Sequence, residues 1–184
     1  MTDLNAFVQE INLALSDAQR SCDKFTQVLS EIDESSRLFL IGNGGSFSIA
    51  SHMATDFTNV NGIRCVTLSD TNMLTCFAND YGYEHAIEKY LSYHLTHRDI
   101  LLTISSSGQS INMVNAQAYA KLKGVKTLSC TGFKSTNPVK TNSDVAFWVD
   151  SNNYNVVEMA HHIFLCGLCE ILKDKKSGPG MDET

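Results

Sequence analysis

Five short β-prone runs, each separated from the next by a segment long enough for a helix, constrain the fold more than any other feature of this chain. Strands that alternate with helices form right-handed crossovers, which build a parallel sheet with helices on both faces. We therefore expect an α/β fold with a doubly wound, five-stranded parallel sheet. The predicted strands are Leu38–Ile41, Arg64–Leu68, Ile100–Ile104, Lys126–Cys130 and Val145–Val149.

Helical patterns precede the first strand and follow the last. From Leu4 to Ile32 apolar residues recur at helical spacing, which predicts one long or two shorter leading helices. The last helix is expected from about Tyr154 to Lys173. The chain has 184 residues and shows no internal repeat, so we expect a single domain over residues 1–176 and a flexible tail over 177–184.

The negative net charge of the chain argues against nucleic acid and anionic membranes as binding partners. The formal net charge is −6, whereas a surface for nucleic acid or for an anionic membrane needs a face rich in lysine and arginine. No apolar run approaches the roughly 20 residues of a membrane span, and the first residues lack the pattern of a signal peptide. These features predict a cytoplasmic protein that contacts neither nucleic acid nor membrane.

The six cysteines mostly lie in apolar runs, where a thiol behaves as a small hydrophobic group. We expect buried, reduced thiols. Cys166 and Cys169 have the spacing of a redox pair or of half a zinc site, but they fall in a helical pattern without a partner pair.

A glycine-rich turn, Gly42-Asn43-Gly44-Gly45-Ser46, joins the first strand to the next helix. Glycines allow positive φ and close approach of a ligand to the backbone, and Asn43 and Ser46 offer hydrogen bonds at a helix N-terminus. Asn43, Gly44 and Ser46 are therefore candidate substrate-binding residues. A tight strand-to-helix turn would use the same residues for steric reasons alone.

A serine-rich loop follows the third strand and leads into a helix predicted over Ile111–Leu122. Its four hydroxyls and the free N–H groups of that helix can bind a phosphate dianion without lysine or arginine. The alternative is a simple helix cap, which would explain Ser107 or Ser110 only. In a parallel sheet both loops lie at the carboxyl ends of strands, so we expect Asn43 and Ser107 to line one cavity. The four serines are Ser105, Ser106, Ser107 and Ser110.

Three motifs in this order resemble the sugar isomerase (SIS) domain family. They are GNGGS after the first strand, Asn79-Asp80 followed by Tyr-Gly-Tyr, and SSSGQS after the third strand. Within that family the likeness is greatest to the sedoheptulose-7-phosphate isomerases, also called phosphoheptose isomerases. The resemblance implies a homotetramer with active sites shared between subunits.

The resemblance also implies roles for single residues. The four serines would hold the phosphate of a phosphorylated sugar, Asn43 and Ser46 would line the sugar, and Asp80 would face the substrate. His52 and Asp56, four residues apart on one helix face, match a pair that serves as acid and base and can bind zinc. The family has glutamate where this chain has Asp56, and a carboxylate withdrawn by about 1 Å can cost roughly a hundredfold in rate.

The last helix departs further from the family pattern. Alignment places Val157 and Leu165 where the family has a glutamine and a histidine that complete the metal site. Neither side chain can bind a metal or carry a proton. His161 lies between them on the same stripe and is a candidate catalytic residue, whereas Glu158 and His162 are expected on neighbouring faces. A histidine in an apolar helix also serves as a core residue.

Two functions are consistent with these features. The first is a phosphosugar aldose–ketose isomerase acting on sedoheptulose 7-phosphate or a related sugar, with Asp56 as base, assisted by His52 and His161, and with zinc as a candidate cofactor at His52 and Asp56. The alternative is a catalytically weak or inactive SIS protein that binds a phosphosugar or a protein partner as a regulator.

Overall fold

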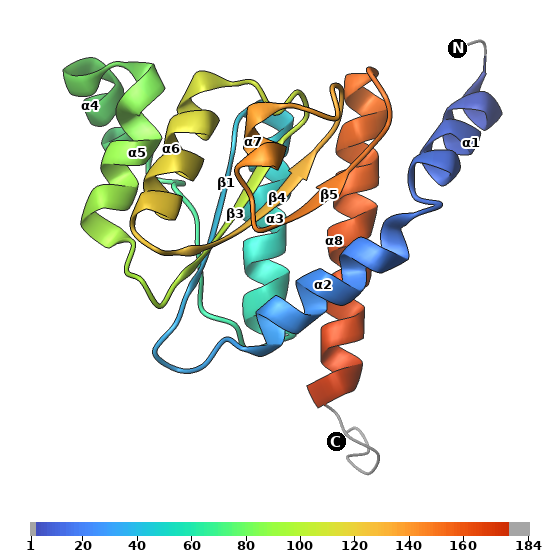
Figure 1. Cartoon of the computed structure of the whole chain (residues 1–184), viewed down its shortest axis with the longest axis horizontal. Coiled ribbons are helices and arrows are strands. Elements are labelled where there is room, and N and C mark those ends of the chain that lie inside the picture. Colours follow the sequence, from blue (N-terminus) through green and yellow to red (C-terminus); the bar gives the residue numbers. More distant parts are fainter. Residues whose placement is uncertain (1–2, 177–184) are drawn as a thin grey trace.

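A computed structural model describes residues 3–176 of the chain and contains a five-stranded parallel sheet flanked by helices (Figure 1). The strand order is β2-β1-β3-β4-β5, and neighbouring strands run parallel. The doubly wound α/β fold predicted from the sequence is confirmed. The strands are β1 (Leu38–Gly42), β2 (Cys65–Val66), β3 (Ile100–Ser105), β4 (Lys126–Thr131) and β5 (Val145–Trp148).

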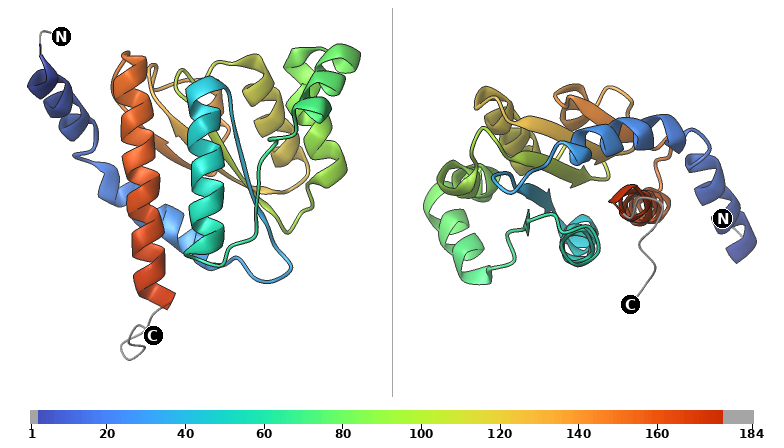
Figure 2. Two further views of the ribbon diagram at one scale, coloured as in Figure 1. Left: turned by 180° about the vertical axis from the view of Figure 1, so that it is seen from behind. Right: turned by 90° about the horizontal axis from the view of Figure 1, so that it is seen from below.

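Helices cover both faces of the sheet, as Figure 2 shows from below. Helices α2, α3 and α8 pack on one face, and α5, α6 and α7 pack on the other, with α4 beside α5. The helices are α1 (Leu4–Ala14), α2 (Ala18–Ser30), α3 (Gly44–Asn59), α4 (Thr71–Tyr81), α5 (Tyr83–His94), α6 (Ile111–Leu122), α7 (Pro138–Thr141) and α8 (Tyr154–Lys176).

Strand β1 explains why the sheet needs cover on both faces. Its five residues are all buried, and successive side chains point to opposite faces. Leu38 and Leu40 therefore join the core with α2, α3 and α8, while Phe39 and Ile41 join the core with α5 and α6. Burial of both faces fixes the register of β1, and with it the position of the loop that follows.

An ion pair joins the beginnings of β1 and β3, the strands that carry the two loops. The guanidinium of Arg37 lies 2.9 Å from the carboxylate of Asp99, whose side chain is fully buried. Burial alone would raise the pKa of Asp99, but the hydrogen bonds and charge of Arg37 together with hydrogen bonds from Thr96 outweigh it, so the pKa lies below its ordinary value. The pair fixes β1 and β3 side by side at their amino ends.

The leading segment forms two helices rather than one. The break falls between Ala14 and Ala18, and Asp3 caps the first helix by accepting a 2.8 Å hydrogen bond from the Ala6 N–H. Helix α8 begins at Tyr154 as expected and runs three residues beyond the predicted end. The predicted tail, 177–184, lies outside the described residues.

Helix α8 is longer and more apolar than the sequence analysis allowed. Residues Tyr154–Lys175 meet the length and composition of a membrane span, with a mean hydropathy of 1.3, which corrects the expectation that no segment approaches one. Half of that segment is buried inside the fold, where it packs on α1, α2 and α3. Its apolar character is therefore that of a helix in the protein core.

The cysteines are free thiols, and three of the six are buried. Cys166 and Cys169 lie on α8, where Cys169 Sγ contacts the Asn61 side chain and Cys166 Sγ contacts Met53. Burial raises the pKa of Cys65 to about 12, so this thiol stays protonated. These cysteines are part of the packing between α8 and its neighbours.

Candidate functional site

The two polar loops that follow β1 and β3 line a single cavity. Gly42 at the end of β1 is the register partner of Ile104 in β3, so the residues that follow each strand emerge side by side. The cavity has a volume of about 100 Å³. Its lining residues are Asn43, Ser46, Ser105, Ser106, Ser107, Ser110, Tyr154 and Glu158.

The glycines of the first loop place the α3 N-terminus at this cavity. Gly44 has φ +52°, a conformation that favours glycine. A Cβ on Gly42 would lie 2.6 Å from the Ser46 carbonyl carbon, so only glycine lets α3 begin directly after β1. The first amides of α3 are thereby brought to the cavity together with the buried hydroxyl of Ser46.

The second loop keeps its hydroxyls largely free for a ligand. Ser110 is the N-cap residue of α6, yet its side chain makes no capping hydrogen bond. Ser107 makes one local contact, in which Oγ accepts a 3.3 Å hydrogen bond from the Gln109 N–H. Gly108, with φ +63°, packs against Asn137, a buried side chain that a sequence pattern does not reveal. A simple helix cap therefore does not account for Ser110.

Asn43 is held in place by two residues that the sequence analysis did not single out. Its amide forms a reciprocal pair with Asn112, with N···O distances of 3.0 and 2.9 Å. The Tyr83 hydroxyl donates a third hydrogen bond, of 2.9 Å, to Asn43 Oδ1. Tyr83 belongs to the Tyr-Gly-Tyr motif, whereas Asn112 is found only from the fold.

Glu158 places a carboxylate beside the serines, which the sequence analysis also missed. Its Oε1 lies 3.5 Å from the Ser106 hydroxyl. A Cβ on Gly45 would collide with the same carboxylate, so Gly45 makes room for it at the start of α3. Glu158 therefore adds negative charge to a cavity whose other groups are hydroxyls, an amide and helix N–H groups.

His52 and Asp56 lie together on α3, and a further histidine from α8 joins them. His52 Nε2 lies 3.2 Å from Asp56 Oδ2, and His52 Nδ1 lies 2.8 Å from His162 Nε2. The side chains of His52 and Asp56 are 50% and 35% exposed. Partial burial and the charge of His52 lower the pKa of His162, against an opposing effect of Asp56. Neutral His162 can accept a proton at pH 7.

The α8 stripe that faces α3 differs from the predicted one. Glu158, His162 and Cys166 face α3, whereas Val157, His161 and Leu165 are fully buried. The placement of His161 at the crevice is therefore wrong. Adjacent residues on a helix differ in direction by about 100°, so a one-residue error in phase moves the whole stripe to another face.

His161 lies instead in the protein core, edge-on to the Phe147 ring. Burial lowers its pKa to about 4, against a smaller opposing effect of the nearby Thr131 backbone. Neither ring nitrogen makes a hydrogen bond of good geometry to the described residues. His161 is thus a neutral core residue at pH 7, and it does not line the cavity.

Asp80 lies on α4 and does not line the cavity in the part of the chain that the structure describes. Its side chain is exposed, accepts a 2.9 Å hydrogen bond from Asn79 Nδ2 and contacts Cys76. The structure therefore brings together Asn43, Ser46 and the four serines, and separately His52 and Asp56, but it leaves Asp80 apart from both groups.

The histidine cluster does not form a metal site as arranged. Asp56 and His162 bind opposite nitrogens of the His52 ring, so the three side chains do not converge on one point. Within residues 3–176, no group of three or more His, Cys, Asp or Glu side chains has an arrangement that could hold a metal ion. The donors present thus do not fit the predicted zinc.

Comparison with known proteins agrees with the fold. The family described as "SIS domain" matches residues 7–132. Phosphoheptose isomerase of Helicobacter pylori (strain Shi470) is 34% identical over 152 residues, which is 79% of each chain. Phosphoheptose isomerase of Aliarcobacter butzleri (strain RM4018) is 29% identical over 181 residues, or 94% of each chain.

Solved structures of similar fold include phosphoheptose isomerase GmhA from Neisseria gonorrhoeae, with a TM-score of 0.84 and 23% identity over 91% of this chain and 94% of that one. The NanR protein of Vibrio vulnificus complexed with ManNAc-6P has a TM-score of 0.71 and 14% identity, over 95% of this chain and 64% of that one. These two likenesses concern the fold. The family match and the sequence identity together show that this chain belongs to the SIS domain family.

Proposed function

We propose that the chain is an aldose–ketose isomerase of a phosphorylated sugar, with sedoheptulose 7-phosphate as the first substrate to test. The observation that carries this proposal is the meeting of the Asn43 loop and the Ser105–Ser110 loop in one cavity. The relatives named phosphoheptose isomerase, one of them aligned over 94% of the chain, support the same reaction.

The cavity suits the phosphate group of such a sugar. Serine hydroxyls and the N-terminal amides of α3 and α6 donate hydrogen bonds to phosphate oxygens, and the helix dipoles favour a dianion. None of the described residues that line the cavity is Lys or Arg, so the hydroxyls and amides supply the binding. This agrees with the acidic net charge of the chain.

The proposed acid and base groups are His52 and Asp56 on α3 and His162 on α8. Glu158 lines the cavity, and His162 is four residues further along the same face of α8, about 6 Å along the helix axis. A sugar chain whose phosphate lies among the serines can run along this line toward His52 and Asp56. The proposed base, Asp56, removes a proton from one of two adjacent carbons. The proton returns to the other carbon while the hydroxyl proton moves between their oxygens.

His162 extends the proposed machinery beyond the pair found from the sequence. Its contact with His52 links the two histidines and Asp56 in one hydrogen-bonded chain. We assign the proton transfer between the substrate oxygens to His52 and His162, and we assign no catalytic role to His161. No step is assigned to zinc, because the donors do not converge.

We further propose that the chain forms a homo-oligomer and that it is cytoplasmic. Apolar side chains are exposed on α1 and on the outer face of α8, including Leu4, Leu13, Met159 and Ile163. Such exposed apolar surfaces are typical of subunit contacts. The tetramer is carried over from the family resemblance.

The test is NMR of the protein with sedoheptulose 7-phosphate, with and without added zinc, to detect an aldose product. The proposal expects turnover in both samples. In Asp56→Ala, turnover should be lost while a phosphosugar still raises the melting temperature. Normal turnover in this variant would remove Asp56 from the mechanism.

A non-catalytic binder of phosphosugars is the second candidate. It is favoured by the buried position of His161 and by the exposure of one third of the Asp56 side chain, which leave fewer groups for catalysis than the family pattern implies. A phosphosugar that raises the melting temperature without any turnover would establish the binder and reject the isomerase.

A further inference from the structure

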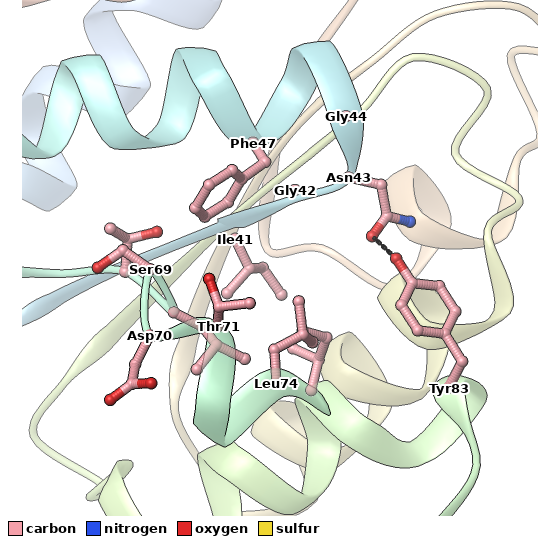
Figure 3. A pocket seen from close by; sticks show the side chains of 13 residues that line it. Ile41, Gly42, Asn43, Gly44, Phe47, Ser69, Asp70, Thr71, Leu74 and Tyr83 are labelled. Carbon is pink, nitrogen blue, oxygen red and sulfur yellow. Dashed lines mark hydrogen bonds between the residues drawn. The ribbon is translucent and has the colours of Figure 1, made fainter. Parts of the chain in front are cut away.

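A second, more apolar cavity lies next to the serine-lined one, and its lining is drawn in Figure 3. Its volume is about 170 Å³, and it is enclosed by the end of β1, the start of α3 and the segment from β2 into α4. Asn43 lines both cavities. The site proposed above for phosphate and proton transfer makes no use of this second cavity.

The interior of this cavity is apolar and its edge is polar. Phe47 points in from α3 and Leu74 from α4, with Ile41 between them, as Figure 3 shows. Hydroxyl groups and one amide group line the edge of the cavity around these apolar side chains. They belong to Asn43, Thr67, Ser69, Thr71 and Tyr83. An aromatic ring with hydroxyl and amide groups around it suits a compound that has an apolar face and several hydroxyls.

The charges at the cavity favour a neutral ligand. No Lys, Arg or His is among the described residues that line it, so an anion would find no countercharge. Asp70 is the one carboxylate, and its Oδ1 already accepts hydrogen bonds from the N–H groups of Asn72 and Met73 at the start of α4. The α4 N-terminus thereby offsets the Asp70 charge, which reduces the attraction for a cation.

One polar atom in the lining lacks a partner. Thr67 Oγ1 is buried and makes no hydrogen bond with the described residues. A buried hydroxyl without a partner is costly, and because Thr67 lines the cavity, rotation about its Cα–Cβ bond would bring this hydroxyl to a ligand. The observation is independent of the shape and the charge of the cavity.

We infer that this cavity is a binding site for a small neutral polyol or unphosphorylated sugar. Such a ligand packs its carbon skeleton on Phe47 and hydrogen-bonds to Thr67. Tyr83 donates its hydroxyl to Asn43, the residue that the two cavities share. The inference does not depend on isomerase activity.

The test is a titration of the full chain with erythritol, followed by backbone amide NMR, beside a titration with inorganic phosphate. Erythritol should give saturable shifts at Asn43 and over residues 67–74, whereas phosphate should shift residues 105–110. Thr67→Val should weaken erythritol binding by about three- to tenfold, the effect of one hydrogen bond. Thr75→Val, on an exposed part of α4, is the matched control and should leave it unchanged.

The amide shifts that erythritol causes in the unmodified chain test the inference even if Thr67→Val fails to fold. Absence of saturable shifts at residues 67–74 would overturn the inference, and so would erythritol shifts confined to residues 105–110. Because neither titration measures turnover, an inactive chain that still binds erythritol at residues 67–74 would reject the isomerase and leave this inference standing.

Discussion

His52 on α3 and His162 on α8 are in direct contact, with 2.8 Å between Nδ1 of the first and Nε2 of the second. The residue beside His162, His161, is turned about 100° around the helix axis and is fully buried. The two neighbouring histidines therefore lie in different environments, and substitutions can distinguish them.

His162→Gln should lower kcat by about a hundredfold or more, since general acid–base groups typically contribute 10²- to 10⁴-fold. The glutamine keeps a polar side chain of similar reach at the α3 face but cannot transfer a proton. Affinity for the phosphosugar, measured by calorimetry, should change little because the phosphate cavity is intact. A variant with unchanged kcat would exclude His162 from proton transfer.

His161→Leu should leave kcat unchanged and alter stability in acid. Burial lowers the pKa of His161 to about 4, whereas an unfolded histidine titrates near 6.5, so below about pH 6.5 protons bind preferentially to the unfolded chain. The folded state therefore loses stability as pH falls from about 6.5 toward 4, by on the order of 2 kcal/mol between pH 7 and 5. Urea unfolding at both pH values should show that His161→Leu lacks this part of the loss. An identical pH dependence in both proteins would contradict the buried, neutral state.

Ser107→Ala combined with Ser110→Ala should weaken binding of the phosphosugar by about a hundredfold, because each hydroxyl removed costs one hydrogen bond to a charged group. Ser48→Ala is the control, since Ser48 is exposed on α3 and bonds only to a carbonyl of its own helix. Calorimetry with the sugar phosphate gives both affinities. Equal affinity of the double variant and the control would place the phosphate elsewhere.

Glu158→Gln should tighten binding of inorganic phosphate by about tenfold, since it removes a like charge from the cavity while the side chain keeps its size. The gain should decrease as ionic strength rises. Weaker binding of phosphate by the variant than by the unmodified chain would contradict this prediction and show that the carboxylate favours binding.

The strands and the two polar loops were accessible from the sequence because their signals are local. The alternation of β-prone and helical segments determines the parallel sheet, and the carboxyl ends of neighbouring strands must meet at one edge. Asn43 and Ser107 could thus be assigned to a common cavity without coordinates. The ends of α6 were predicted to the residue, since Ser110 precedes a regular helical pattern.

The contacts that α8 makes with α3 and with the cavity depend on tertiary structure. Which face of α8 meets α3 is decided by packing across a helix that is apolar nearly all round, so its sequence pattern does not select between the His161 and His162 stripes. Glu158 reaches the cavity from α8, far from both loops in sequence, and Asn112 on α6 holds Asn43 from 69 residues away. Such non-local contacts leave no signal in a short motif.

If the hydroxyls and helix amides of the two strand-to-helix loops hold the phosphate of a sugar, a crystal structure of the chain soaked with sedoheptulose 7-phosphate will show it there. We expect the phosphorus atom among Ser46, Ser106 and Ser110, with the carbon chain running toward His52. Phosphate bound outside this cavity, with the serines free of the ligand, would contradict it.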